Sequence, residues 1–195
     1  MRRPPFDYAP RHYYQAKYSS KNIPIFEKSG LLDECEIVNG IQLKYSEPAD
    51  AISPKQYFNT HHIPLHKRPI LKAKLYRKAS AFPIKEFNLE TKSSYLIGRI
   101  SINKTSNGIY SSRNSILDIG IPDRSYSKQH CVIQFREIKG RLCAYIMDLE
   151  SVNGTSLNGI SIPTRRYVEL SNNDTISYQI ENDISADYEV LFQQG

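Results

Sequence analysis

Polar and charged side chains recur in the turns that separate apolar segments in the second half of the chain. Arg99 follows one apolar run, Ser127 and Lys128 precede another, and Asn153 lies in a later turn. Together they offer a guanidinium, a hydroxyl, an ammonium and a carboxamide. A phosphate ester carries about −1.5 to −2 charges and three acceptor oxygens, and a guanidinium fork with short neutral donors matches that group. We therefore expect an oxyanion-binding site.

The hypothesis that the same segment forms the active site of a hydrolase has less support. Ser127 lies three residues before His130, and Asp148 would have to complete a catalytic triad. A triad also needs an oxyanion hole and an acid that orients the histidine, whereas Asp148 falls inside an apparent strand. The sequence contains no glycine-rich phosphate loop, zinc-ligand spacing or nucleophile-elbow motif. We therefore expect a binding protein rather than an enzyme, with no cofactor and no metal.

The elements that must position these side chains have the pattern of short strands. They are rich in β-branched and aromatic residues, and Asn-Gly turns punctuate them. Many short strands without amphipathic helices between them predict an antiparallel β-sandwich, whose loops converge at one end. The polar stretch 101–114 is expected to be a long loop. The expected strands cover residues 70–76, 95–97 (stopped by Gly98), 131–135, 144–149, 167–170, 175–178 and 188–192.

Charge is distributed unevenly along the 195 residues. The first 80 residues hold 14 Lys and Arg against 7 Asp and Glu, whereas the remainder holds 12 against 13. A basic surface for nucleic acid over the whole fold is therefore not indicated. No apolar run approaches the roughly 20 residues of a membrane span, and no apolar stretch follows the basic start. We expect neither a signal peptide nor a membrane partner.

The three cysteines are far apart in sequence and form no Cys-x-x-Cys pair. A disulfide framework and a closed zinc site are therefore not expected, and a reducing compartment fits best. Cys131 and Cys143 stand in apolar surroundings, and we expect them to act as small buried hydrophobes.

The chain divides near Lys67, with the folded domain expected over residues 67–195. Residues 1–21 are rich in Tyr, Arg and Pro without an apolar period, as in a disordered tail. Their aromatic and basic interleaving would also suit weak contact with single-stranded RNA. Residues 22–66 form an arm of isolated apolar clusters that either lies on the folded domain or docks into a partner. The expected docking residues are Pro24, Phe26, Gly30, Leu31 and Leu32.

The combined motif resembles the forkhead-associated (FHA) domain family over roughly residues 69–193. Its GR…SxxH…NG signature appears here as Gly98-Arg99, Ser127 to His130, and Asn153-Gly154. The resemblance implies an all-β, eleven-stranded FHA-type sandwich that reads phosphothreonine peptides through loops at one end, with an extended, largely irregular N-terminal arm before it.

The resemblance also implies individual roles. Arg99 and Ser127 would hold the phosphate, Lys128 would add a phosphate contact, and Asn153 would bond the peptide backbone. The residues implied to fix loop geometry or form turns are Gly98, His130, Gly154, Asn158 and Gly159.

One position departs from the family pattern. Many phosphothreonine readers carry Thr or Ser directly before the asparagine, where this chain has Val152. One phosphate donor is therefore missing. This leaves open a second hypothesis, a purely structural subunit with a weakened phosphate pocket.

Longer segments resemble one FHA subfamily, which comprises the pre-mRNA leakage protein of yeasts and the nuclear Smad-interacting protein of animals. This resemblance implies membership of the nuclear retention and splicing (RES) complex, which associates with the spliceosome and limits export of unspliced pre-mRNA. It also implies that the arm docks on the RNA-recognition-motif subunit of that complex. The matching segments are residues 127–135, 147–149 and 153–155 in the sandwich, and 26–32, 40–48 and 50–54 in the arm.

Overall fold

The computed structural model describes residues 37–38, 40–78, 80–100, 116–178 and 186–195, with the backbone alone at 103–104 and 110–111. The expected tail, residues 1–21, and all five expected docking residues lie outside this part of the chain. Neither of the two described helices has the length and apolar character needed to cross a membrane.

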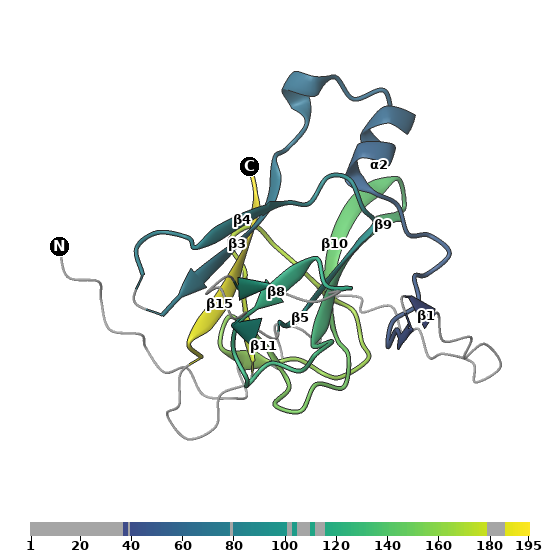
Figure 1. The fold of residues 1–195 in the computed structure, drawn as a ribbon. Coiled ribbons are helices and arrows are strands. Elements are labelled where there is room, and N and C mark those ends of the chain that lie inside the picture. Colours follow the sequence, from purple (N-terminus) through teal and green to yellow (C-terminus); the bar gives the residue numbers. More distant parts are fainter. Residues whose placement is uncertain are drawn as a thin grey trace.

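Two stacked sheets form a sandwich (Figure 1). The five-stranded sheet has the order β13-β10-β9-β5-β8, and the six-stranded sheet has the order β12-β11-β14-β15-β3-β4. All neighbours are antiparallel except β5 and β8. The first sheet comprises β5 (Ser94–Arg99), β8 (Ile119–Ile121), β9 (Cys131–Ile138), β10 (Arg141–Asp148) and β13 (Val168–Glu169). The second comprises β3 (Leu71–Arg77), β4 (Lys85–Asn88), β11 (Thr155–Leu157), β12 (Ile160–Ser161), β14 (Thr175–Tyr178) and β15 (Tyr188–Gln194).

The predicted all-β sandwich is confirmed, and the described strands of its two sheets number eleven, as the family resemblance implied. The expectation that Gly98 stops its strand is wrong. β5 continues to Arg99 because Gly98 pairs with Gly120 of β8. The stretch 101–114, expected to be a loop, contains a short antiparallel pair, β6 (Asn103–Lys104) with β7 (Tyr110–Ser111). A second short pair, β1 (Ile37–Val38) with β2 (Ile41–Gln42), precedes the sandwich.

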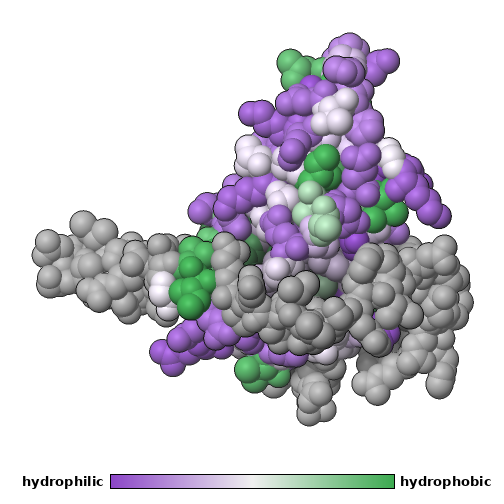
Figure 2. Space-filling view, turned by 90° about the vertical axis from the view of Figure 1, so that its right-hand side faces the viewer, coloured by the Kyte–Doolittle hydropathy of each residue, from purple (hydrophilic) through white to green (hydrophobic). Residues whose placement is uncertain are grey.

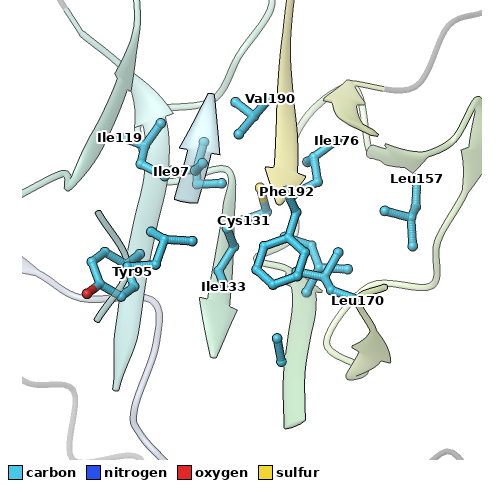
Figure 3. Packing of buried hydrophobic residues seen from close by; sticks show 14 of the residues in the cluster. Tyr95, Ile97, Ile119, Cys131, Ile133, Leu157, Leu170, Ile176, Val190 and Phe192 are labelled. Carbon is cyan, nitrogen blue, oxygen red and sulfur yellow. The ribbon is translucent and has the colours of Figure 1, made fainter. Parts of the chain in front are cut away.

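The main core lies between the sheets (Figure 3). Alternate residues of β5 and β9, including Ile97 and Ile133, face Val190 and Phe192 of β15 across this layer. All four side chains are fully buried. Burying one such side chain is worth roughly 1.5–3 kcal/mol relative to leaving it exposed. This alternation fixes the strand register and therefore the places where the loops emerge.

The five-stranded sheet is also apolar on its outer face. The side chains that alternate with those of the main core form a second buried cluster there, and Leu43 and Tyr45 cover it. The sheet is therefore buried on both faces, by the second sheet and by the segment that precedes the sandwich. The cluster consists of Leu96, Val132, Tyr145, Met147, Leu149 and Tyr167.

A short helix that the sequence analysis did not predict follows this segment. In α2 (Pro54–Thr60), the Ser53 hydroxyl accepts a hydrogen bond from the Gln56 amide, and proline occupies the first turn. Tyr57 is buried and donates to the Gly140 carbonyl in the β9–β10 hairpin at 3.0 Å. A 3₁₀ turn, η1 (Leu65–Lys67), precedes β3. The sequence placed residues 40–66 in the arm. In the structure, this segment packs on the sandwich.

Candidate phosphate-binding site

Three loops meet at one end of the sandwich. Ile97 near the end of β5 and Asp148 at the end of β10 both pair with Cys131, the first residue of β9. The hairpin that joins β9 to β10 lies at the opposite end, beside α2 (Figure 1). The end of β5, the turn before β9 and the loop after β10 therefore emerge together, although they are distant in sequence.

Ser127 is the junction of the three loops. Its carbonyl accepts a hydrogen bond from the Arg99 amide at 2.8 Å, and its Oγ accepts one from the Val152 amide at 3.0 Å. A hydroxyl that accepts from an amide keeps its own proton for donation. The Ser127 hydroxyl is thus oriented between the loops with a donor left for a ligand oxygen.

The side chains of Arg99 and Asn153 are each tied to the turn before β9. The Arg99 guanidinium donates to the Arg124 carbonyl at 3.1 Å, and the Asn153 amide donates to the Ser125 carbonyl at 2.8 Å. A guanidinium has five N–H donors, and a carboxamide has a second N–H and an acceptor oxygen. Both groups are therefore oriented while most of their hydrogen-bonding capacity is left for a ligand.

Gly98 permits the close approach of β5 to the turn before β9. A Cβ atom at this position would lie 2.2 Å from the Lys128 carbonyl oxygen, well inside contact distance. Any side chain here would push the two segments apart, and with them Arg99 and Ser127. The Lys128 side chain itself is exposed.

His130 is fully buried beneath the turn, where its Nδ1 accepts a hydrogen bond from the Ser127 amide at 3.1 Å. Burial lowers its pKa to about 4, although the Asp148 charge opposes the shift. The imidazole is therefore neutral near pH 7, and its Nδ1 acts on the shape of the turn. No hydrogen bond between the imidazole and the Ser127 hydroxyl or Asp148 is found among the described residues.

Asp148 organises the loop that carries Val152 and Asn153. Its carboxylate is fully buried, and it accepts hydrogen bonds from the Ser151 hydroxyl at 2.5 Å, the Thr155 hydroxyl at 2.6 Å and the Ser151 amide at 3.2 Å. These bonds hold the loop at both of its ends. From the sequence, Asp148 stood out only as a candidate catalytic acid, and this structural role was not predicted. The Asp-x-x-Ser-x-x-x-Thr spacing is the signal that could have shown it.

The structure does not place Asn158 and Gly159 at the junction of the loops. They form the two-residue turn between β11 and β12, with φ angles of 54° and 79°, as expected for a tight hairpin turn. The Asn158 side chain donates to Asp174 at 2.7 Å and accepts from the Thr175 amide at 2.8 Å. Gly154, in contrast, directly follows Asn153 in the loop held by Asp148.

Neither of the two described cysteines contributes a side chain to the site. Cys131 is buried, and burial raises the pKa of its thiol, whereas Cys143 is half-buried. Cys35 lies outside the described residues. Among the described residues, no group of three His, Cys, Asp or Glu side chains could hold a metal ion.

Comparisons with known proteins show which proteins this chain is similar to. The FHA domain family matches residues 95–178. Pre-mRNA leakage protein 1 of Saccharomyces cerevisiae is 41% identical over 184 residues, which cover 90% of this chain and 89% of that protein. Smad nuclear-interacting protein 1 of Mus musculus is 31% identical over 168 residues, which cover 81% of this chain and 37% of that protein.

Two solved structures of the yeast protein are also similar. The crystal structure of full-length yeast Pml1p has a TM-score of 0.68 and 38% identity, and the match covers 77% of this chain and 99% of that chain. A second structure describes the yeast Pml1 splicing factor and its integration into the RES complex. It has a TM-score of 0.67 and 40% identity, and the match covers 78% of this chain and 98% of that chain.

Proposed function

Because the chain belongs to the family of FHA-domain proteins that includes yeast pre-mRNA leakage protein 1, we propose that it is a nuclear subunit of the RES complex. In this role it supports pre-mRNA splicing and the retention of unspliced pre-mRNA. Its sandwich binds a phosphothreonine-containing protein, and its N-terminal arm docks on the RNA-recognition-motif subunit. The similarity to a splicing factor that integrates into the RES complex supports the assembly part of the proposal.

The main support for phosphothreonine binding is that Arg99, Ser127 and Asn153 lie together at one end of an FHA-type sandwich. Each side chain has a hydrogen-bond partner that orients it and a remaining donor for a ligand. Hydrogen bonds to a charged phosphate are worth about 1.5–3 kcal/mol each, and an arginine can make two in parallel. Preoriented donors lose little freedom on binding, which favours recognition of a small anionic group.

The charge around the site favours an anion. Arg99 is joined there by the exposed side chains of Arg124 and Lys128. His130 adds no charge near pH 7 because its pKa is held at about 4. The positive field thus comes from arginine and lysine side chains, and we expect phosphate ionisation to control the pH dependence of binding.

Residues 40–66 pack on the sandwich, so we place the docking function of the arm in residues 22–36. Figure 2 shows a face of the molecule on which the described residues are mostly hydrophilic and apolar residues form only small patches. Subunit interfaces usually bury larger apolar patches. Phe26, Leu31 and Leu32 are apolar anchors of the kind that dominate peptide affinity, so they remain our candidates for docking.

One observation favours the alternative of a purely structural FHA subunit. The Val152 side chain is 89% exposed at the edge of the site, where a threonine would supply a further phosphate donor. Under this alternative, the sandwich packs against neighbouring subunits and binds no phosphopeptide.

The test uses the full chain in two assays. The first asks whether it selects phosphothreonine peptides from a degenerate library, with a phosphatase-treated library as the control. The second measures binding to the RNA-recognition-motif subunit of the RES complex for wild type, Phe26→Ala and Arg99→Ala. Truncating a buried anchor often costs 2 kcal/mol or more, so Phe26→Ala should weaken this association roughly 30-fold.

Arg99→Ala should leave subunit binding unchanged. Loss of subunit binding in Arg99→Ala but not in Phe26→Ala would refute the docking arm. A library with no phosphate-dependent binder would refute the phosphothreonine site and leave the structural alternative.

A further inference from the structure

Residues 41–52, which we call the strap, run along the outer face of β9 from one end to the other. At the site end, the strap contacts Gln129, which lies in the turn just before β9. At the far end, Ala51 bridges to Arg136, and the Ile52 amide donates to the Phe135 carbonyl at 3.2 Å. The strap therefore connects the phosphate-site end of the sheet to the hairpin end.

The strap is fixed firmly at the hairpin end. Asp50 forms a two-pronged ion pair with Arg136, at 2.8 and 2.6 Å, and the Arg136 side chain is only 1% exposed. Its guanidinium also lies over the rings of Tyr145 and Tyr167, 5.8 and 4.9 Å from their centroids. A paired and stacked guanidinium of this kind holds its partner in one place.

At the site end, the strap is joined to the turn that carries Ser127. Gln129 stands two residues after Ser127 and is only 8% exposed. Its side-chain oxygen accepts from the Lys44 amide at 2.8 Å, and its side-chain nitrogen donates to the Gln42 carbonyl at 2.8 Å. Gln129 therefore binds the strap backbone through both ends of its carboxamide.

The strap is also joined to the loop that carries Asn153. The Lys44 ammonium donates to the Leu149 carbonyl at 3.2 Å and to the Glu150 carbonyl at 3.4 Å. Glu150 has a φ of 53°, a conformation that non-glycine residues adopt only when neighbours hold them in it. Arg165 adds a further link, donating to the Lys44 carbonyl and to the Glu150 carboxylate.

We propose that the strap is a positioning element of the phosphate site, with Gln129 and Lys44 as its positioning residues. One strap residue, Lys44, holds both the turn of Ser127 and the loop of Asn153, so the docked strap sets the spacing of the two ligand-binding side chains. This rests on the proposed phosphothreonine binding. Linkage requires the reverse effect as well: a bound phosphopeptide stabilises the docked strap by the same factor.

The experiment uses full-length protein and a phosphothreonine peptide that the wild type selects from the degenerate library. Gln129→Leu removes both hydrogen bonds to the strap at similar volume, and Lys44→Met removes the ammonium. Lys72→Met is the matched control, because Lys72 is a partly exposed lysine of β3 in the other sheet that pairs with Glu86. We expect Gln129→Leu and Lys44→Met to weaken peptide binding about 5- to 30-fold, Lys44→Arg to retain binding, and Lys72→Met to bind as the wild type does.

Amide hydrogen exchange separates positioning from general stability. Exchange of the Val152 amide, which reports the bond to Ser127, should speed up in Gln129→Leu at unchanged melting temperature. Peptide should slow exchange of the Lys44 amide in the wild type. If Gln129→Leu does not fold, Lys44→Met is used alone. The Lys44 side chain is exposed, so we expect this variant to fold.

The outcomes separate the two proposals. Absence of any phosphate-dependent peptide binding in the wild type would overturn both. Wild-type affinity in Lys44→Met, with faster exchange of the residue-44 amide showing that the strap has left Gln129, would overturn the positioning role alone.

Discussion

The Val152 amide donates a hydrogen bond of 3.0 Å to the Ser127 hydroxyl, and this bond joins the two loops that face the expected ligand. The backbone of Val152 is therefore built into the site, while its side chain is 89% exposed. Sequence comparison with other phosphothreonine readers draws attention to the missing hydroxyl at this position. The structure adds that the backbone contact, which any residue could make, is in place.

Val152→Thr should therefore strengthen phosphothreonine binding. Threonine has nearly the same volume, keeps the amide bond to Ser127 and adds a hydroxyl at the edge of the site. One added hydrogen bond contributes about 0.5–1.5 kcal/mol, which corresponds to roughly 2- to 10-fold in affinity. Calorimetry with a wild-type ligand peptide measures the change, and Val152→Ala is the control that should bind as the wild type does. Weaker binding of the threonine variant would show that the hydroxyl does not reach the phosphate.

Peptide binding should strengthen as the pH rises from 5 to 7. The second phosphate ionisation lies near pH 6, and the dianion interacts more strongly with Arg99 and Lys128. His130 stays neutral in this range because burial holds its pKa at about 4, so acid adds no positive charge there. A titration of affinity against pH gives the measurement, and tighter binding at pH 5 than at pH 7 would contradict the assignment of the charged groups.

The same buried imidazole should make the fold sensitive to acid. The folded-state pKa of His130 lies below the ordinary value of 6.5, so the unfolded chain binds more protons between about pH 6.5 and 4. The neutral His130 side chain therefore contributes to the free energy of unfolding above pH 6.5. This contribution, about 3 kcal/mol in total, is lost as the pH falls through about 4. Urea unfolding across this range should give a shallower pH dependence for His130→Gln than for the wild type, with exposed His62→Gln as the control. Equal slopes for His130→Gln and wild type would rule the effect out.

Removing one partner of the Asp50–Arg136 ion pair, which anchors the strap, should lower the free energy of unfolding. Asp50→Ala leaves the buried Arg136 guanidinium without its carboxylate. Removing one partner of a fully buried pair costs about 3–5 kcal/mol, and the cost should be smaller here because the Asp50 side chain is 37% exposed. The double variant Asp50→Ala with Arg136→Met should be less destabilised than Asp50→Ala alone, because it removes the buried charge. Chemical unfolding of the two variants and the wild type tests this, and the reverse order of stability would contradict it.

The sequence predicted the sandwich well because its strands are short runs of β-branched and aromatic residues separated by turn signals. Residues such as Ile97, Ile133 and Val190 stand in such runs. The strands it missed, such as β8 (Ile119–Ile121) and β12 (Ile160–Ser161), are too short to show a period. Helix α2 was missed because it has only seven residues, and its buried residues, Pro54, Tyr57 and Phe58, are too few to show a helical period.

The candidate site was predictable at the positions of a recognisable motif. Arg99, Ser127 and Asn153 could be named from their spacing, but each link between them uses a backbone N–H or carbonyl group, whose position leaves no trace in residue type. The same holds for the strap. Gln129 and Lys44 are 85 residues apart in sequence, and only the folded chain shows that they are partners.

Calorimetry of Arg99→Ala tests the central claim most directly. Full-length wild type, Arg99→Ala and the control Arg77→Ala, an exposed arginine of β3, are titrated with one phosphothreonine peptide and its unphosphorylated form. A hydrogen bond to a charged group is worth about 1.5–3 kcal/mol. We therefore predict at least tenfold weaker binding for Arg99→Ala, wild-type affinity for Arg77→Ala, and no measurable binding of the unphosphorylated peptide. Equal affinity of Arg99→Ala and wild type would show that the phosphate is not read at this end of the sandwich.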